Sequence, residues 1–151
     1  MNRRRLMTIW QVAFALAVIA VASPKASAQL NNCTVSGVVD LKASATAVLG
    51  QCTPTTSIDP STQGVTLTVD GLDGLSVTFA AGSFTKTWFG GYVAHETTPT
   101  KAGILLQPLK GGHLAYSAAI EGVASNSTSV TVSLSIGEQT GSAAGKALVF
   151  P

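Results

Sequence analysis

The chain has 151 residues, of which 46% are hydrophobic and only 11% are charged, and its formal net charge is +2 at pH 7. Four of the nine Lys and Arg residues lie within positions 1–28, so the rest of the chain has five bases against seven acids, a net charge of −2. No basic patch with interleaved aromatic residues remains after position 28, which argues against nucleic acid and anionic membrane surfaces as partners.

The first 28 residues have the pattern of a secretory signal peptide. Three arginines at positions 3–5 precede an uncharged apolar run, and Ala26-Ser27-Ala28 is a small-x-small cleavage site. The apolar run over 9–22 has about 14 residues, fewer than the roughly 20 of a membrane-spanning helix. We therefore expect cleavage after Ala28 and a secreted, periplasmic or cell-surface product with no membrane span. Both the general and the twin-arginine export routes stay open, because the arginine cluster fits the twin-arginine pattern only loosely.

The two cysteines, Cys33 and Cys52, are predicted to form a disulfide, because export places them in an oxidising compartment. If 34–40 and 44–51 form a hairpin that turns at 42–43, residues pair so that their numbers sum to 85, and Cys33 lies opposite Cys52. A short helix is the alternative, since apolar residues recur at helical spacing and Gly50 would cap it. The cysteines lack the Cys-x-x-Cys spacing of redox centres, so the bridge is interpreted as structural.

After a turn-rich linker over 53–64, the chain reads as a series of short strands. Alternating apolar and hydroxyl residues over 65–69 and 75–79 predict a hairpin around positions 71–74. Further strands are expected over 85–95, 103–108, 114–120, 130–136 and 146–150. This pattern predicts an all-β fold, either an antiparallel β-sandwich of immunoglobulin-like type or a small barrel. The disulfide hairpin with its linker (29–63) and the later strands (64–151) are expected to form one domain.

The stretch from Ser129 to Ile136 alternates most clearly. Its apolar residues are expected to face a core, and its hydroxyl residues to face water. Four residues are predicted to be core residues on facing strands, namely Val77, Phe79, Val132 and Leu134. The hydroxyl face is interpreted as solvated surface, and binding of glycans or a neighbouring sheet is the alternative.

The aromatic cluster Trp88, Phe89 and Tyr92 lies beside Gly90-Gly91 and is the best candidate for binding. Exposed, these rings would stack on a sugar or anchor a protein partner. Buried, they would supply much of the core of a chain with few aromatic residues. Burial is the more common outcome for large aromatic side chains, and it is the interpretation favoured here.

Three segments between Gly64 and Phe150 combine turns and strands in a particular order. A Gly-Ser-Phe turn leads to a Gly-Tyr strand within 80–94, and a Pro-Leu hairpin with an aromatic residue follows within 104–123. A Val-x-Val-x-Leu-x-Ile-Gly strand then precedes a glycine-bounded turn within 129–149. This order resembles an uncharacterised β-rich module that recurs in secreted proteins of environmental bacteria. The resemblance implies export and a β fold, and it supplies no catalytic residue. The segment from Glu96 to Ala102 departs from the module, which has a tight glycine turn there, so a longer loop is expected.

No motif of catalysis or cofactor binding stands out. The Gly-x-Ser-x-Gly nucleophile motif and a glycine-rich phosphate loop are both missing from the sequence. His95 and His113 are the only histidines, and a zinc site that joins them with Glu96 or Glu121 is disfavoured against two surface histidines. Two aspartates in the 70–74 turn lack the ligand spacing of a calcium loop. Neither catalytic residues nor metal ligands nor a cofactor are therefore assigned.

These observations predict an exported, non-enzymatic structural or binding module of the periplasm or cell surface, with a glycan or a protein as its partner. One alternative is a small secreted hydrolase or metal-dependent enzyme that uses His95 and His113. Another is a pilus- or adhesin-like subunit that assembles by strand addition, because the expected edge strands carry few charges that would block pairing.

Overall fold

The computed structural model describes residues 29–70, 75–98 and 100–151, and these residues contain strands and no helix. The predicted signal peptide and its cleavage site, together with the turn at 71–74, lie outside the described residues. The strands are β1 (Leu30–Asp40), β2 (Ala45–Pro54), β3 (Val65–Asp70), β4 (Leu75–Phe79), β5 (Thr85–Lys86), β6 (Tyr92–Glu96), β7 (Ala102–Pro108), β8 (Leu114–Glu121), β9 (Ser129–Ile136) and β10 (Gln139–Phe150). The predicted all-β class is confirmed.

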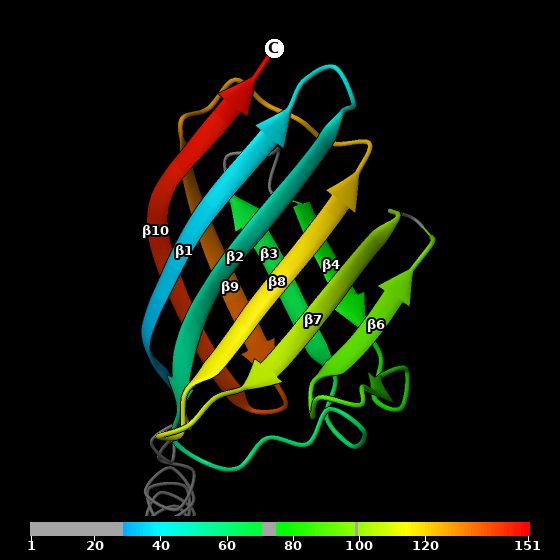
Figure 1. Ribbon diagram of the computed structural model, residues 1–151, viewed down its shortest axis with the longest axis vertical. Coiled ribbons are helices and arrows are strands. Elements are labelled where there is room, and N and C mark those ends of the chain that lie inside the picture. Colours follow the sequence, from blue (N-terminus) through cyan, green and yellow to red (C-terminus); the bar gives the residue numbers. More distant parts are fainter. Residues whose placement is uncertain (1–28, 71–74, 99) are drawn as a thin grey trace, which may run out of the picture.

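All ten strands belong to one curled sheet in the order β4-β3-β9-β10-β1-β2-β8-β7-β6-β5. The long strand β10 pairs with β9 over its first part and with β1 over its last part, so it carries the sheet from one layer to the other. In Figure 1, β9, β3 and β4 lie behind β1, β2 and β8, and the result is a half-barrel. Two separate sheets, as in the expected sandwich, are therefore replaced by one continuous sheet.

The pairing of β1 with β10 is parallel, whereas the other named strand pairs are antiparallel. The expectation of a purely antiparallel arrangement is therefore wrong for this pair. The parallel pairing arises because β1 and β10 come from opposite ends of the described chain and meet in the middle of the sheet. Pairing between such distant segments leaves no local signal in the sequence.

The N-terminal hairpin forms in the predicted register. Thr34 pairs with Gln51 and Asp40 with Ala45, so the position numbers sum to 85, and the helical alternative is wrong. A bulge shifts the register between Asn31 and Thr34, where Asn32 adopts a positive φ of 51°. The turn is held by the side chain of Asp40, whose Oδ1 accepts a hydrogen bond from the backbone N–H of Ala43 at 2.9 Å.

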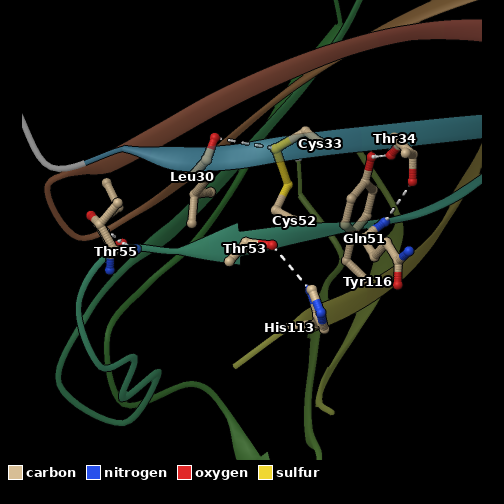
Figure 2. Close-up of a disulfide and its surroundings, with 10 residues drawn as sticks. Leu30, Cys33, Thr34, Gln51, Cys52, Thr53, Thr55, His113 and Tyr116 are labelled. Carbon is tan, nitrogen blue, oxygen red and sulfur yellow. Dashed lines mark hydrogen bonds between the residues drawn. A yellow bond between two sulfur atoms is a disulfide. The ribbon is translucent and has the colours of Figure 1, made fainter. Parts of the chain in front are cut away.

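The predicted disulfide between Cys33 and Cys52 is present and bridges β1 and β2, with a Cα–Cα distance of 4.2 Å (Figure 2). Cys52 is buried in the core and Cys33 packs against it. Beside the bridge, the hydroxyl of Tyr116 on β8 donates to the carbonyl oxygen of Thr34 at 2.8 Å. The bridge and this hydrogen bond together connect the three neighbouring strands β1, β2 and β8.

The alternating strands face the core as predicted. On β9, Val130, Val132, Leu134 and Ile136 are buried, and the hydroxyl residues between them are exposed or half-buried. Val77 and Phe79 on β4 are also buried. These two residues and Val132 and Leu134 do not lie on facing strands, however, since β4, β3 and β9 are neighbours in the same layer of the sheet.

The single strand predicted over 85–95 is divided in two. β5 ends at Lys86 and β6 begins at Tyr92, with a turn between them. The turn forms because Gly90 adopts a positive φ of 85°, a conformation that disfavours residues with a side chain. Between β6 and β7, where a longer loop was expected, the structure describes residues 97, 98, 100 and 101 of the connection.

Strand β10 begins seven residues earlier than the predicted strand at 146–150. Its glycines suggested a loop, but they permit the close approach of β1. A Cβ atom at Gly145 would lie 1.9 Å from the carbonyl oxygen of Val35, and one at Gly141 would lie 2.4 Å from that of Leu30. These glycines are therefore required by packing within the sheet. The actual turn before β10 is the pair Gly137-Glu138, with Gly137 at φ 58°.

The linker between β2 and β3 is attached to the sheet by the buried side chain of Gln139. Its Oε1 accepts hydrogen bonds from the backbone N–H of Thr55 (2.9 Å) and of Thr56 (3.3 Å), and its Nε2 donates to the carbonyl oxygen of Thr56 (3.2 Å). Farther along the linker, the hydroxyl and the backbone N–H of Ser61 donate to Asp59, and these bonds lower the pKa of the Asp59 carboxyl.

Candidate functional site

The candidate site is the turn over 87–91, which joins β5 to β6 at the lower end of the half-barrel in Figure 1. Below, this segment is called the Trp88 turn. Its ends are locked by four hydrogen bonds between Thr87 and the two glycines. The backbone N–H of Thr87 donates to the carbonyl oxygen of Gly91 at 2.8 Å, and the N–H of Gly90 donates to that of Thr87 at 3.2 Å. The Thr87 hydroxyl accepts from the N–H of Gly91 at 2.9 Å and donates to the Gly91 carbonyl oxygen at 3.2 Å.

Gly91 also seats the turn against β7. A Cβ atom at this position would lie 2.6 Å from Oε1 of Gln107, so only glycine fits here without a shift. The Nε2 of Gln107 donates to the carbonyl oxygens of Phe89 (3.4 Å) and Pro108 (3.2 Å). A side chain from β7 thus donates a hydrogen bond to the turn, and the backbone that carries the aromatic rings is hydrogen-bonded at both ends.

Trp88 projects from this turn with 96% of its surface exposed. Phe89 is also exposed, and the two rings form an edge-to-face pair with centroids 5.4 Å apart and an interplanar angle of 88°. The expectation that the aromatic cluster is buried is therefore wrong for these two residues. Tyr92, by contrast, is half-buried and packs against the core. The physical reason is the turn, which reverses the chain and directs residues 88 and 89 away from the sheet.

A second surface feature, a hollow, lies at the same end of the strands. This hollow, of about 350 Å³, opens between the linker after β2 and the turn from β7 to β8. Pro54, Ile58, Leu109 and His113 are among the residues that line it. Figure 2 shows that the imidazole of His113 lies beside β2, where its Nδ1 is 3.0 Å from the Thr53 hydroxyl.

The structure does not bring the two histidines together. His95 lies on β6 opposite Gly103, which pairs with Ala119, whereas His113 immediately precedes β8 at the opposite end of that strand. Six residues of strand separate these levels, or about 20 Å at 3.3 Å per residue. One metal ion could not contact both imidazoles at this separation. Among the described residues, there is also no group of three His, Cys, Asp or Glu side chains that could hold a metal ion.

The aromatic cluster was predicted from the sequence, but the residues that surround it were not. Nothing in the sequence indicated that Gln107 supports the turn or that the linker forms a hollow with the β7–β8 turn. The paired glycines after Phe89 were the one available signal, because Gly-Gly beside aromatic residues is typical of a turn.

No protein-family model matches this chain, and comparisons with curated protein sequences and with solved structures gave no match. Within residues 29–70, 75–98 and 100–151, no helix has the length and apolar character needed to cross a membrane. The Cys33–Cys52 disulfide is consistent with an oxidising compartment outside the cytoplasm.

Proposed function

We propose that this protein is an exported, non-enzymatic binding module of the periplasm or cell surface, and that its Trp88 turn binds a glycan. Export is supported by the signal-peptide pattern of residues 1–28 and by the disulfide. The single observation that carries the binding proposal is the exposure of Trp88, at 96%, on a turn fixed by hydrogen bonds.

The energetics of the turn favour a contact role. An exposed indole contributes little to the core, and leaving it in water forgoes the roughly 1.5 to 3 kcal/mol that burial of a large apolar side chain provides. A ligand that covers the ring would recover part of that free energy. Because the hydrogen bonds of Thr87 and Gly91 already fix the backbone, little conformational entropy is lost when the ligand binds. The flat faces of sugar rings suit stacking on aromatic side chains, and the exposed Thr85 and Lys86 lie next to the turn as polar partners.

The proposal is tested with a panel of polysaccharides and oligosaccharides and the variant Trp88→Ala. The variant is expected to lose at least about thirtyfold in affinity, equivalent to about 2 kcal/mol. Its free energy of unfolding should change by less than about 0.5 kcal/mol, since the side chain makes few core contacts. Ser142→Ala is the control, because Ser142 is exposed on β10 and lies outside the turn. Glycan binding that is equal in the two variants would contradict the proposal, as would the absence of binding across the panel.

Strand addition is a second candidate, favoured by the edge strand β4. This strand ends the sheet, and none of its residues from Leu75 to Phe79 is charged, whereas edge strands are commonly protected by charge. If β4 accepts a strand from another subunit, the protein should form fibres that are visible by electron microscopy. Ser76→Lys, which places a charge on the exposed face of β4, should abolish them. A protein that forms no fibres at high concentration would not support this candidate.

A further inference from the structure

The two outer faces of the half-barrel differ in chemistry. On the layer of β4, β3 and β9, outward positions are occupied by hydroxyl residues, two pairs of which bond across strands: Thr66 with Thr78 and Thr68 with Ser76, each at 3.2 Å. On the layer from β10 to β6, four outward positions hold large exposed apolar side chains. Leu148 is 65% exposed, Phe150 is 52% exposed and Leu49 is 49% exposed, and Val38 is exposed as well. Contiguous exposed apolar patches are uncommon on soluble monomers and typically mark interaction surfaces.

The strand registers arrange this second face into rows. The Leu row crosses five strands and consists of Ser36, Leu49, Ser117, Leu105 and Val93. Two residues farther along each strand, the Ala row consists of Leu148, Val38, Ala47, Ala119, Gly103 and His95. On β1, β2, β8, β7 and β6, neither row contains Asp, Glu, Lys or Arg, and the exposed Lys146 on β10 lies beside the Ser36 end of the Leu row. The Leu row has two ridges, and the middle of the Ala row is a trough of small residues.

This face also contains two hollows. One of about 420 Å³ lies between Leu49 and Leu105, over the small side chains of Ala115 and Ser117 on β8. The other, of about 350 Å³, lies over Gly103 and Ala119 and is bordered by Glu96, Lys101 and Glu121. Protruding side chains and hollows therefore alternate along the same surface.

We propose that this face binds a second copy of the chain and forms a two-fold symmetric dimer. A two-fold axis parallel to the rows, placed between them, sets each Leu row against the Ala row of the other copy. Leu49 of one copy then lies opposite Ala47 of the second, and Leu105 lies opposite Gly103. Each ridge meets a trough, which is the self-complementarity that a two-fold interface requires. Because the two rows contain no Asp, Glu, Lys or Arg, and the single histidine, His95, lies opposite Val93 of the other copy, like charges are not brought together along these rows.

The size of the face suits a dimer. Each outward position occupies about 30 Å² of sheet, so about 20 positions on six strands cover roughly 600 Å². A pair of copies would bury about 1,200 Å², within the range of specific interfaces, and the apolar rows would lie at its centre. The charged pair of Lys101 and Glu121, whose Nζ and Oε2 atoms are 3.0 Å apart, lies at the margin of the face and stays in contact with water.

The test is sedimentation velocity of the disulfide-bonded protein, recovered after expression of the full chain, over a wide range of concentrations. The mass is expected to rise from one chain to two. Leu49→Asp should weaken association at least about tenfold, since it places a charge opposite Ala47. Ser142→Asp, on the part of β10 that pairs with β9, is the matched control and should dimerise like the unmodified protein. Leu49→Met should also retain the dimer. Circular dichroism confirms that each variant is folded.

A mixing experiment tests the predicted contact directly. Ala47→Lys alone should also prevent association, because it places an ammonium group opposite Leu49. An equimolar mixture of the Leu49→Asp and Ala47→Lys proteins should form a heterodimer, in which the introduced carboxylate of one copy meets the introduced ammonium group of the other. The proposal is overturned if the unmodified protein stays monomeric at every concentration, if Leu49→Asp still dimerises, or if the mixture stays monomeric. Monomers that bind phosphatidylcholine vesicles through Leu49 would instead assign the face to a lipid surface.

Discussion

Tyr116 connects the N-terminal hairpin to β8 through a single hydrogen bond to the carbonyl oxygen of Thr34. Burial disfavours the charged phenolate and raises the pKa of Tyr116 to about 12, against about 10 in the unfolded chain. Because the folded-state pKa is the higher of the two, the stability contributed by the neutral phenol is fully present below about pH 10. That stability decreases as the pH rises from about 10 to about 12, where the folded protein also loses the proton.

We therefore expect the free energy of unfolding to fall over this pH interval, and Tyr116→Phe to remove that part of the decline. The phenol is followed by absorbance of tyrosinate, with the Tyr116→Phe protein as the reference for the difference spectrum. A Tyr116 that ionises near pH 10 in the folded protein would contradict the burial and the hydrogen bond described above.

The fully buried amide side chain of Gln139 joins the linker to the sheet. Gln139→Met keeps a similar volume but leaves the N–H groups of Thr55 and Thr56 without this acceptor. The free energy of unfolding should fall by about 1 to 3 kcal/mol, as measured by urea denaturation. Thr140→Ala, at the next and exposed position of β10, should cost less than about 0.5 kcal/mol. Equal losses at the two positions would show that the linker is not held by Gln139.

At the scale of the element, β10 depends on its glycines. Gly145→Ala would place a methyl group 1.9 Å from the carbonyl oxygen of Val35, so the two strands must separate. We expect a loss of about 3 kcal/mol or more in the free energy of unfolding, measured by urea denaturation. Ser142→Ala, on the same strand but exposed, is the control and should be nearly neutral. A stable Gly145→Ala protein would mean that β1 and β10 do not approach as closely as described.

The elements that the sequence predicts well are those with local patterns. The β9 strand was predicted from strict alternation between Val130 and Ile136, and the first hairpin from the spacing of Cys33 and Cys52. Both patterns act over a few residues, and the disulfide adds a covalent constraint. The extent of β10 was missed because Gly141 and Gly145 read as turn residues. Their role depends on β1, a strand more than 100 positions earlier in the chain.

The residues of the candidate site were predicted from the sequence, but their exposure to solvent was not. Trp88 and Phe89 were identified as the best binding candidates, yet burial was the favoured interpretation. Apolar character alone does not tell whether a side chain serves a core or a ligand. The deciding feature is the turn made by Thr87, Gly90 and Gly91, which depends on hydrogen bonds and on the support of Gln107 from a different strand.

At the scale of the whole molecule, the half-barrel presents three surfaces with different chemistry. One layer exposes hydroxyl residues and the other exposes apolar rows, while the Trp88 turn projects from the lower end. A dimer through the apolar rows would leave the turn of each copy free. Two Trp88 turns on one particle would then bind a repetitive ligand such as a polysaccharide with an avidity above that of a single turn.

Acrylamide quenching of tryptophan fluorescence tests the exposure of Trp88 most directly, since Trp88 is the only tryptophan after position 28. The measurement uses protein that has lost residues 1–28, verified by mass, and compares the folded form with the form unfolded in guanidinium chloride. We predict emission at the wavelength of a water-exposed indole and a quenching constant in the folded protein close to that of the unfolded chain. A blue-shifted emission that acrylamide does not quench would place Trp88 in the core and would contradict its assignment as a contact residue.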